Sequence, residues 1–174
     1  MNKSRGFTMM ELLVTVVVAA ILASVAVPAF NTFVQNDKLL SGSNSLVYSL
    51  NLARGEAIKQ DVGGGVTVCA SANGTTCGGT WAQGWIVLSA AGGAPVLSAP
   101  ALPASINMGE ASGLTQVTFL STGTTSFTAG PTAAAFTMCD SRGPTFGRYV
   151  QVTAMGRVAS SVGQTLNGGG LVCP

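Results

Sequence analysis

Histidine is absent from this 174-residue sequence, and charged residues make up only 8% of it. A general base would therefore have to be a lysine or one of a few carboxylates, which beyond the N-terminal segment are Asp37, Glu56, Asp61, Glu110 and Asp140. The sequence shows no close carboxylate pair, no serine–histidine arrangement and no glycine-rich phosphate loop in a suitable context. We therefore predict that the protein is not an enzyme, and we expect no cofactor.

An excess of charge of one sign is also lacking. The formal net charge is +2, and Lys3 and Arg5 account for all of it, so acidic and basic residues balance in the rest of the chain. Proteins that attract nucleic acid through their overall charge carry a clear basic excess. The composition therefore does not indicate a globally basic nucleic-acid binder.

One long stretch near the N-terminus carries no charge at all. The nineteen residues from Leu12 to Phe30 would form a helix about 28 Å long, close to the ~30 Å hydrocarbon core of a bilayer. Lys3 and Arg5 precede it, so the positive-inside rule keeps the N-terminus cytoplasmic and exports the rest of the chain. A cleaved secretory signal is the alternative, but its apolar region would be shorter.

Glu11 is a carboxylate at the beginning of this apolar stretch. A charge deep in a membrane helix costs about 2.5–3.5 kcal/mol and usually marks function, although a position near the interface would let the side chain reach water. If the chain were cut after Gly6, Phe7 would carry a new α-amine four residues before Glu11, on the same face of a helix. That amine would be charged at neutral pH. The same pair could form between neighbouring chains.

The segment Gly6-Phe7-Thr8-Met9-Met10-Glu11, followed by the apolar run, resembles the class III signal of type IV pilins and type II secretion pseudopilins. The resemblance implies a leader, residues 1–6, that prepilin peptidase removes between Gly6 and Phe7. It also implies methylation of Phe7 and a role for Glu11 in subunit docking. Residues 7–30 would then be a transmembrane helix that becomes filament core, with a bend at Pro28, because proline removes a helix hydrogen bond.

The helix is predicted to continue beyond the membrane segment, over about residues 8–60, until glycines at 63–65 end it. Apolar residues recur at spacings of three, four and seven, which gives one stripe of a helix. Residues 31–62 are therefore predicted to form the amphipathic second half of this helix, with the apolar stripe packed on a globular domain. The residues of the stripe are Phe33, Val34, Leu39, Leu46, Leu50, Ala53 and Ala57.

The remaining segment, residues 63–174, reads as a β-rich domain. Glycine is frequent, at 23 residues in the chain, and short runs of Val, Thr and aromatic residues are separated by turn residues. Ala90 to Pro103 reads as an irregular loop. The expected fold class is α+β: a long N-terminal helix, transmembrane in its first half, packed on antiparallel sheets as in pilins. The predicted strands are 66–69, 85–88, 116–119, 135–138 and 149–153.

Four cysteines lie in the exported segment, and three pairings are open to them. We favour Cys69–Cys77, which closes a tight turn-rich loop, together with Cys139–Cys173, which ties the C-terminal segment to a strand. A zinc site is disfavoured because histidine and a C-x-x-C motif are both absent. We predict two disulfides, consistent with an oxidising compartment, and no metal.

Three further elements resemble the GspH/FimT branch of this family, which contains minor pilins and pseudopilins. They are W-x-x-G-W at residues 81–85, the Cys139-Asp140-Ser141-Arg142-Gly143 run, and Gly156-Arg157-Val158. We interpret Trp81 and Trp85 as packing residues rather than a ligand platform.

The resemblance implies a minor type IV pilin that helps initiate or cap a pilus, with an H-type secretion pseudopilin as the alternative. Its partners would be other minor and major pilins or pseudopilins, the inner-membrane assembly platform and, before assembly, the bilayer. The chain would cross the bacterial inner membrane once, with its C-terminal domain in the periplasm.

A third interpretation is DNA capture for natural transformation. The basic residues after Lys59 are Arg142, Arg148 and Arg157. Some FimT-type pilins bind DNA through a C-terminal G-R-x-R motif, but Ala159 stands here in place of the second arginine. We therefore predict weak or absent DNA binding, with the arginines paired to Asp140, the C-terminus or another pilin.

Overall fold

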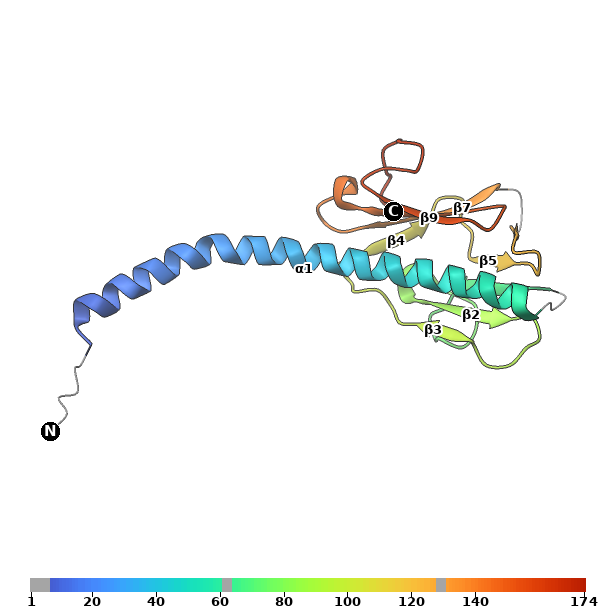
Figure 1. Cartoon of the computed structure of the whole chain (residues 1–174), viewed down its shortest axis with the longest axis horizontal. Coiled ribbons are helices and arrows are strands. Elements are labelled where there is room, and N and C mark those ends of the chain that lie inside the picture. Colours follow the sequence, from blue (N-terminus) through green and yellow to red (C-terminus); the bar gives the residue numbers. More distant parts are fainter. Residues whose placement is uncertain (1–6, 61–63, 128–130) are drawn as a thin grey trace. The chain divides into compact units, whose positions relative to one another are not determined.

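A computed structural model describes residues 7–60, 64–127 and 131–174 of the chain (Figure 1). The predicted leader, including Gly6, lies outside the described residues, as does Gly63. The chain divides into two compact units, Met1–Asp37 and Lys38–Pro174.

A single α-helix, α1, runs from Met9 to Gln60, close to the predicted limits. Its first turn is capped by the Thr8 hydroxyl, which accepts a hydrogen bond from the Glu11 amide at 3.2 Å. Pro28 lies inside α1, and the Thr32 hydroxyl donates to the Pro28 carbonyl oxygen at 3.2 Å. The helix is thus continuous through Pro28, and a functional bend there stays a prediction.

The buried face of α1 begins at Leu39. From that residue onward the predicted stripe is confirmed, and two serines and a glycine complete it. Phe33, which the periodicity placed on the same stripe, is 66% exposed. The assignment of Phe33 was wrong because Phe33 belongs to the first unit, whereas the buried residues of the stripe all belong to the second. The buried residues are Leu39, Gly42, Ser43, Leu46, Ser49, Leu50, Ala53 and Ala57.

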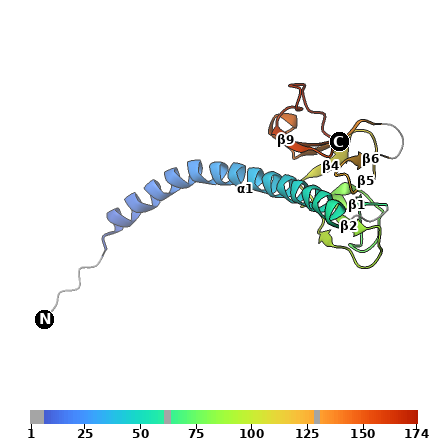
Figure 2. The ribbon, with the colours of Figure 1, turned by 45° about the vertical axis from the view of Figure 1, so that its right-hand side comes forward.

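Two antiparallel sheets make up the rest of the second unit (Figures 1 and 2). The first has the strand order β3-β2-β1-β5-β6 and the second β4-β7-β8-β9. Two short 3₁₀ helices, η1 (Trp81–Gln83) and η2 (Pro144–Phe146), lie in the connections. The strands are β1 Val66–Ala70, β2 Trp85–Ser89, β3 Leu97–Ala99, β4 Asn107–Glu110, β5 Gln116–Phe119, β6 Thr125–Ser126, β7 Ala133–Cys139, β8 Arg148–Thr153 and β9 Val158–Val162.

The prediction of a wholly irregular loop from Ala90 to Pro103 was wrong in one part. Strand β3 lies within it and pairs with β2, Leu97 opposite Val87 and Ala99 opposite Trp85. A strand of three residues among alanines, glycines and prolines is too short to show the alternation of apolar and polar residues by which a strand is recognised. The neighbouring strand supplies the pairing that the local sequence does not specify.

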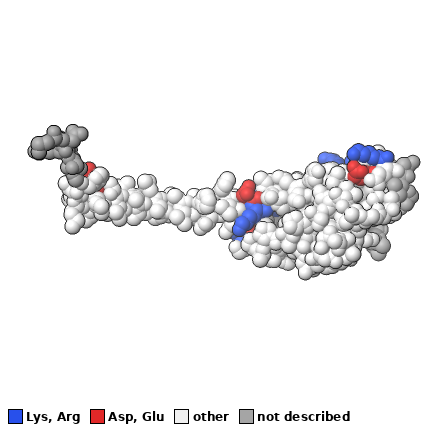
Figure 3. All heavy atoms as spheres, turned by 90° about the horizontal axis from the view of Figure 1, so that it is seen from below, with Lys and Arg blue, Asp and Glu red and all other residues white. Residues whose placement is uncertain are grey.

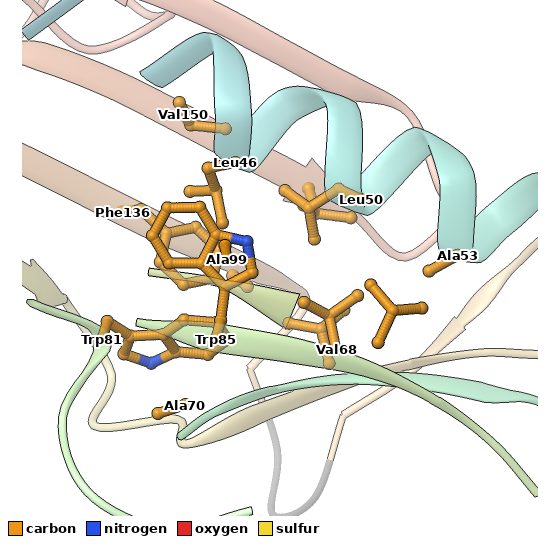
Figure 4. Packing of buried hydrophobic residues seen from close by; sticks show 14 of the residues in the cluster. Leu46, Leu50, Ala53, Val68, Ala70, Trp81, Trp85, Ala99, Phe136 and Val150 are labelled. Atoms are coloured by element: carbon orange, nitrogen blue, oxygen red, sulfur yellow. The ribbon is translucent and has the colours of Figure 1, made fainter. Parts of the chain in front are cut away.

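Trp81 and Trp85 are core residues, as predicted, with exposures of 5% and 1% (Figure 4). The indole N–H of Trp85 donates to the Ser49 hydroxyl of α1 at 2.9 Å, and that of Trp81 donates to the Leu114 carbonyl oxygen at 2.7 Å. Trp81 also packs edge-on against Phe136, with ring centroids 4.8 Å apart. Both polar N–H groups are therefore satisfied in the core.

Gly55 occupies an interior position of α1 without a packing reason in this chain, since a Cβ atom there would meet nothing within 4 Å. Gly55→Ala should therefore raise the free energy of unfolding by about 0.5–1 kcal/mol, the usual gain for alanine over glycine in a helix. Gly42→Ala is the matched control. Its Cβ would lie 3.0 Å from Leu102 Cδ2, so it should show no such gain. Denaturant unfolding of both variants measures the difference, and equal effects would contradict the packing described.

Candidate functional site

The segment from Phe7 to Glu11 is exposed at the start of α1. Phe7 is 73% exposed and precedes Met9, the first helical residue. Among the described residues no cation forms an ion pair with Glu11; the two ion pairs join Lys59 to Glu56 and Arg142 to Asp140. A carboxylate in a first helical turn is favoured by the helix dipole. Glu11 is thus an exposed carboxylate in the first turn of α1.

Apolar side chains cover the helix that follows. Between Leu12 and Phe30 every residue is exposed, and leucine, valine, isoleucine and phenylalanine provide the large side chains. In the described part of the chain, α1 is the one helix long and apolar enough to cross a membrane. An apolar surface of this extent requires lipid or other protein to cover it.

Both disulfides join the cysteines that the sequence analysis favoured. Cys69–Cys77 has a Cα–Cα distance of 5.5 Å and Cys139–Cys173 one of 5.7 Å. The first closes a loop that Asn73 organises, because its side-chain oxygen accepts hydrogen bonds from the amides of residues 75 and 76 at 2.9 and 3.0 Å. The second fastens the C-terminal segment to the end of β7. Among the residues that the structure describes, no three potential metal ligands come together.

The W-x-x-G-W segment has a structural explanation. Gly84 has a φ of +115°, and a Cβ there would lie 2.6 Å from the Ala99 carbonyl oxygen. Glycine is therefore needed between the two tryptophans, because it lets β2 begin beside β3. The motif specifies the core rather than a binding surface.

Arg142 is held by its neighbours. Its guanidinium forms an ion pair with Asp140, with Nη2 2.6 Å from Oδ2, and lies 4.5 Å from the centre of the Phe146 ring. Hydrogen bonding from Arg142 lowers the pKa of the Asp140 carboxyl. Stability from this contact is therefore present above the ordinary pKa of aspartate and lost as the pH falls through the lowered value. The expected pairing of an arginine with Asp140 is confirmed.

The other two candidate arginines lie at opposite ends of β8. Arg148 is the first residue of β8 and half-buried, and its Nε is buried without a hydrogen-bond partner. Arg157 follows β8 in the turn to β9 and is exposed. The length of β8, about 17 Å at about 3.4 Å per residue, lies between Arg148 and the turn that carries Arg157. With Arg142 already paired, the three arginines do not form one basic patch, and charged side chains are few on the face drawn in Figure 3.

Arg157 lines a polar pocket of about 320 Å³ on β8 and β9. The turn that carries it is well defined, since the Gly156 amide donates to the Thr153 carbonyl oxygen at 2.8 Å and the Thr153 amide donates to the Arg157 carbonyl oxygen at 3.0 Å. Gly156 has a φ of +72°, and a Cβ there would collide with the Gly123 carbonyl oxygen. The glycine of the Gly156-Arg157 element therefore has a packing role.

The sequence analysis missed two polar residues that hold loops in place. Arg54 of α1 donates from Nε to the Gly123 carbonyl oxygen at 3.1 Å and from Nη2 to the Met155 carbonyl oxygen at 3.4 Å. Glu110 accepts hydrogen bonds from the amides of Ser112, Leu114 and Ala135 at 2.8, 2.7 and 2.9 Å. Backbone contacts of this kind leave no sequence pattern that could have identified them.

Comparison with known proteins gives two family matches. The family model described as "type II transport protein GspH" matches residues 42–156, and the "prokaryotic N-terminal methylation motif" matches residues 1–27. No curated protein shows significant similarity to the chain.

Two crystal structures of the type IV minor pilin FimU from Pseudomonas aeruginosa (strain PAO1) have a similar fold. The P21 form has a TM-score of 0.58 at 23% sequence identity, covering 74% of this chain and 92% of FimU. The P65 form has a TM-score of 0.56 at 24% identity, covering 71% and 92%. The predicted fold, one long N-terminal helix with antiparallel sheets as in pilins, is confirmed.

Proposed function

We propose that this chain, which belongs to the family of the type II transport protein GspH, is a minor subunit of a type IV pilus that helps to initiate or cap assembly. Members of pilin and pseudopilin families are structural subunits, so the chain is not an enzyme. The observation that carries the proposal is the first unit: an exposed apolar helix with Glu11 in its first turn, matched over residues 1–27 by the methylation motif.

Assembly would proceed from a membrane-anchored precursor. The first unit spans the inner membrane, with the second unit in the periplasm, and prepilin peptidase cuts between Gly6 and Phe7 while the apolar helix stays in the lipid. The new, methylated amine of Phe7 then meets the Glu11 carboxylate of a neighbouring subunit at the assembly platform. Burying Glu11 without a cation would be costly, whereas a paired carboxylate offsets much of that cost. Other pilins would cover the apolar helix once it has left the lipid.

A secretion pseudopilin is the second candidate, and the GspH description of the family model favours it. The fold similarity to a type IV minor pilin favours the pilus. Deleting the gene in its host distinguishes the two. Loss of surface pili with normal secretion supports the proposal, whereas loss of secretion with normal pili supports the pseudopilin.

Gly6→Ala should block leader removal, because the added methyl group crowds the residue whose carbonyl carbon is attacked. The full-length precursor should accumulate in the membrane, heavier than the wild-type protein by the leader, and intact-mass spectrometry measures this. Gly55→Ala, a glycine change far from the leader where a Cβ atom would meet nothing within 4 Å, is the control and should be processed normally. Normal processing of Gly6→Ala would contradict the cleavage assignment.

DNA capture is not favoured by the geometry, because the arginines are separated and Arg142 is paired. Full-length protein in detergent should bind duplex DNA weakly or not at all at physiological salt, as measured by fluorescence anisotropy. Phosphate contacts would make any binding fall steeply with salt. Tight binding that Arg157→Ala abolishes and Arg142→Ala preserves would overturn this prediction.

A further inference from the structure

The outer face of the four-stranded sheet carries polar side chains. Val150 and Val152 of β8 are fully buried in the core. Because side chains alternate along a strand, Gln151 and Thr153 point to the opposite face. Strand β9 extends this face, since Ala159 lies opposite Gln151 in the register. A polar surface therefore lies on the side of the sheet away from the core.

The loop after β9 forms a wall over this surface. The Thr165 amide donates to the Gly169 carbonyl oxygen at 2.8 Å, and the Gly168 amide donates to the Thr165 carbonyl oxygen at 3.0 Å. These bonds fix the turn, so sheet and loop enclose a pocket of about 320 Å³ that is formed without a ligand. That volume lies in the range of small-molecule sites, about 300–1,000 Å³. The pocket is lined by Gln151, Thr153, Arg157, Ala159, Leu166 and Asn167.

Three of the lining side chains have unused hydrogen-bonding capacity. The guanidinium of Arg157 and the carboxamides of Gln151 and Asn167 form neither an ion pair nor a hydrogen bond with other residues that the structure describes. The Thr153 hydroxyl accepts a hydrogen bond from the Arg157 amide at 3.3 Å and still has its proton to donate. The carboxamide of Asn73, by contrast, is used to hold a turn. The polar groups of the pocket are therefore available to a ligand.

The lining side chains fit a sugar that carries one acid group. A guanidinium matches a carboxylate with two parallel hydrogen bonds. A carboxamide both donates and accepts, as the hydroxyl groups of a sugar require. Leu166 is 40% exposed and, with Ala159, offers an apolar surface on which the C–H face of a sugar ring can pack. One charge, several hydroxyls and an apolar face are the features of a hexuronic acid.

The charge in the pocket does not suit a nucleic-acid strand. Arg157 is the one cation among the described residues that line it. Arg142 is paired with Asp140, and Arg148 lies at the other end of β8. A nucleic-acid strand carries a charge at every phosphate, and grooves that bind it place several cations along its backbone. A single guanidinium matches the single charge of a carboxylate.

We propose that this pocket binds a hexuronic acid, free or as a residue of a polysaccharide. Arg157 holds the carboxylate, and the carboxamides of Gln151 and Asn167 bond to ring hydroxyls. The site is independent of whether the chain serves a pilus or a secretion system, because it lies outside the apolar helix through which subunits assemble.

The test uses full-length protein in a detergent without a sugar headgroup, and ligand-observed NMR titrations with D-glucuronate and D-glucose. Glucuronate should bind with a dissociation constant of about 1 mM, as expected for one ring in an open pocket. Glucose has the same ring without the carboxylate and should bind about tenfold more weakly or worse. A tetrasaccharide of glucuronate distinguishes the two sources. Competition by it supports a polysaccharide ligand, and lack of competition supports the free sugar.

Two variants locate the binding. Arg157→Gln should weaken glucuronate binding about tenfold or more, the loss expected for a charge-assisted hydrogen bond. Ala159→Phe fills the pocket without changing its charge and should abolish binding while leaving thermal unfolding unchanged. Lys59→Gln is the matched control, because it removes an exposed cation that does not line the pocket, and it should bind as the wild type does.

Three results would overturn the proposal. They are equal binding of glucose and glucuronate, unchanged glucuronate binding by Arg157→Gln or Ala159→Phe, and displacement of glucuronate by inorganic phosphate at a lower concentration than glucuronate itself requires. The last result would assign the pocket to phosphate instead of a sugar acid.

Discussion

Trp85→Ala is expected to lower the free energy of unfolding of the second unit by about 3–5 kcal/mol, the range for removing a large buried aromatic side chain. Trp85 is 1% exposed and its indole N–H bonds to Ser49 of α1. The substitution leaves a cavity beneath the helix and removes one of the two hydrogen-bond partners of the Ser49 hydroxyl, which still donates to the Ser45 carbonyl oxygen. Denaturant unfolding of the full-length protein in detergent, followed by circular dichroism, measures the loss.

Two controls separate packing from the hydrogen bond. Ser49→Ala removes the hydroxyl but little bulk and should cost about 1–3 kcal/mol, because it leaves the buried indole N–H of Trp85 without its partner. Tyr48→Ala, at the neighbouring helical residue but 61% exposed, should change stability by less than about 0.5 kcal/mol. A Trp85→Ala loss no larger than that of Ser49→Ala would contradict the place given to Trp85 in the core.

Glu11→Ala is expected to reduce the amount of this protein in purified filaments by about tenfold or more while leaving it in the membrane. Removing one partner of a buried ion pair costs about 3–5 kcal/mol, and about 1.4 kcal/mol corresponds to a factor of ten in an equilibrium. Membrane insertion should not suffer, because the apolar segment loses a charge. Quantitative immunoblots of filament and membrane fractions give the ratio.

Glu56→Ala is the matched control for that experiment. It also removes a helical carboxylate, but one paired with Lys59 near the other end of α1, and it should leave incorporation unchanged. Glu11→Gln should resemble Glu11→Ala, since it keeps the size of the side chain and loses the charge. Normal incorporation of either Glu11 variant would contradict a charge-dependent contact.

The sequence predicted the helix and those strands in which the spacing of apolar residues matches the face that is buried in the fold. The stripe from Leu39 to Ala57 and the strands around Val68, Trp85 and Val150 carry apolar or β-branched residues at the period that they adopt. Strand β9 was not predicted, because Val-Ala-Ser-Ser-Val has little apolar alternation. Its place depends on pairing with β8, a contact that no local signal encodes.

Some of the functional residues were likewise predictable from the sequence, and others were not. The cysteine spacing favoured the two disulfides, and the role of Glu11 was suggested by its place in an apolar run. The role of Arg54 depends on carbonyl groups far away in the sequence, and that of Glu110 on the distant Ala135 amide as well as two nearby amides, so both became visible only in the structure. Arg157 was identified from a short element, yet the fold places Arg142 and Arg148 at the other end of β8.

We propose that a processed form of this chain is built into a filament, and the N-terminus of the protein recovered from purified pili tests this. Mass spectrometry of that protein should find a chain that begins at Phe7, carries a methylated amine and lacks residues 1–6. Recovery only from the membrane fraction, with residues 1–6 still attached, would contradict the claim.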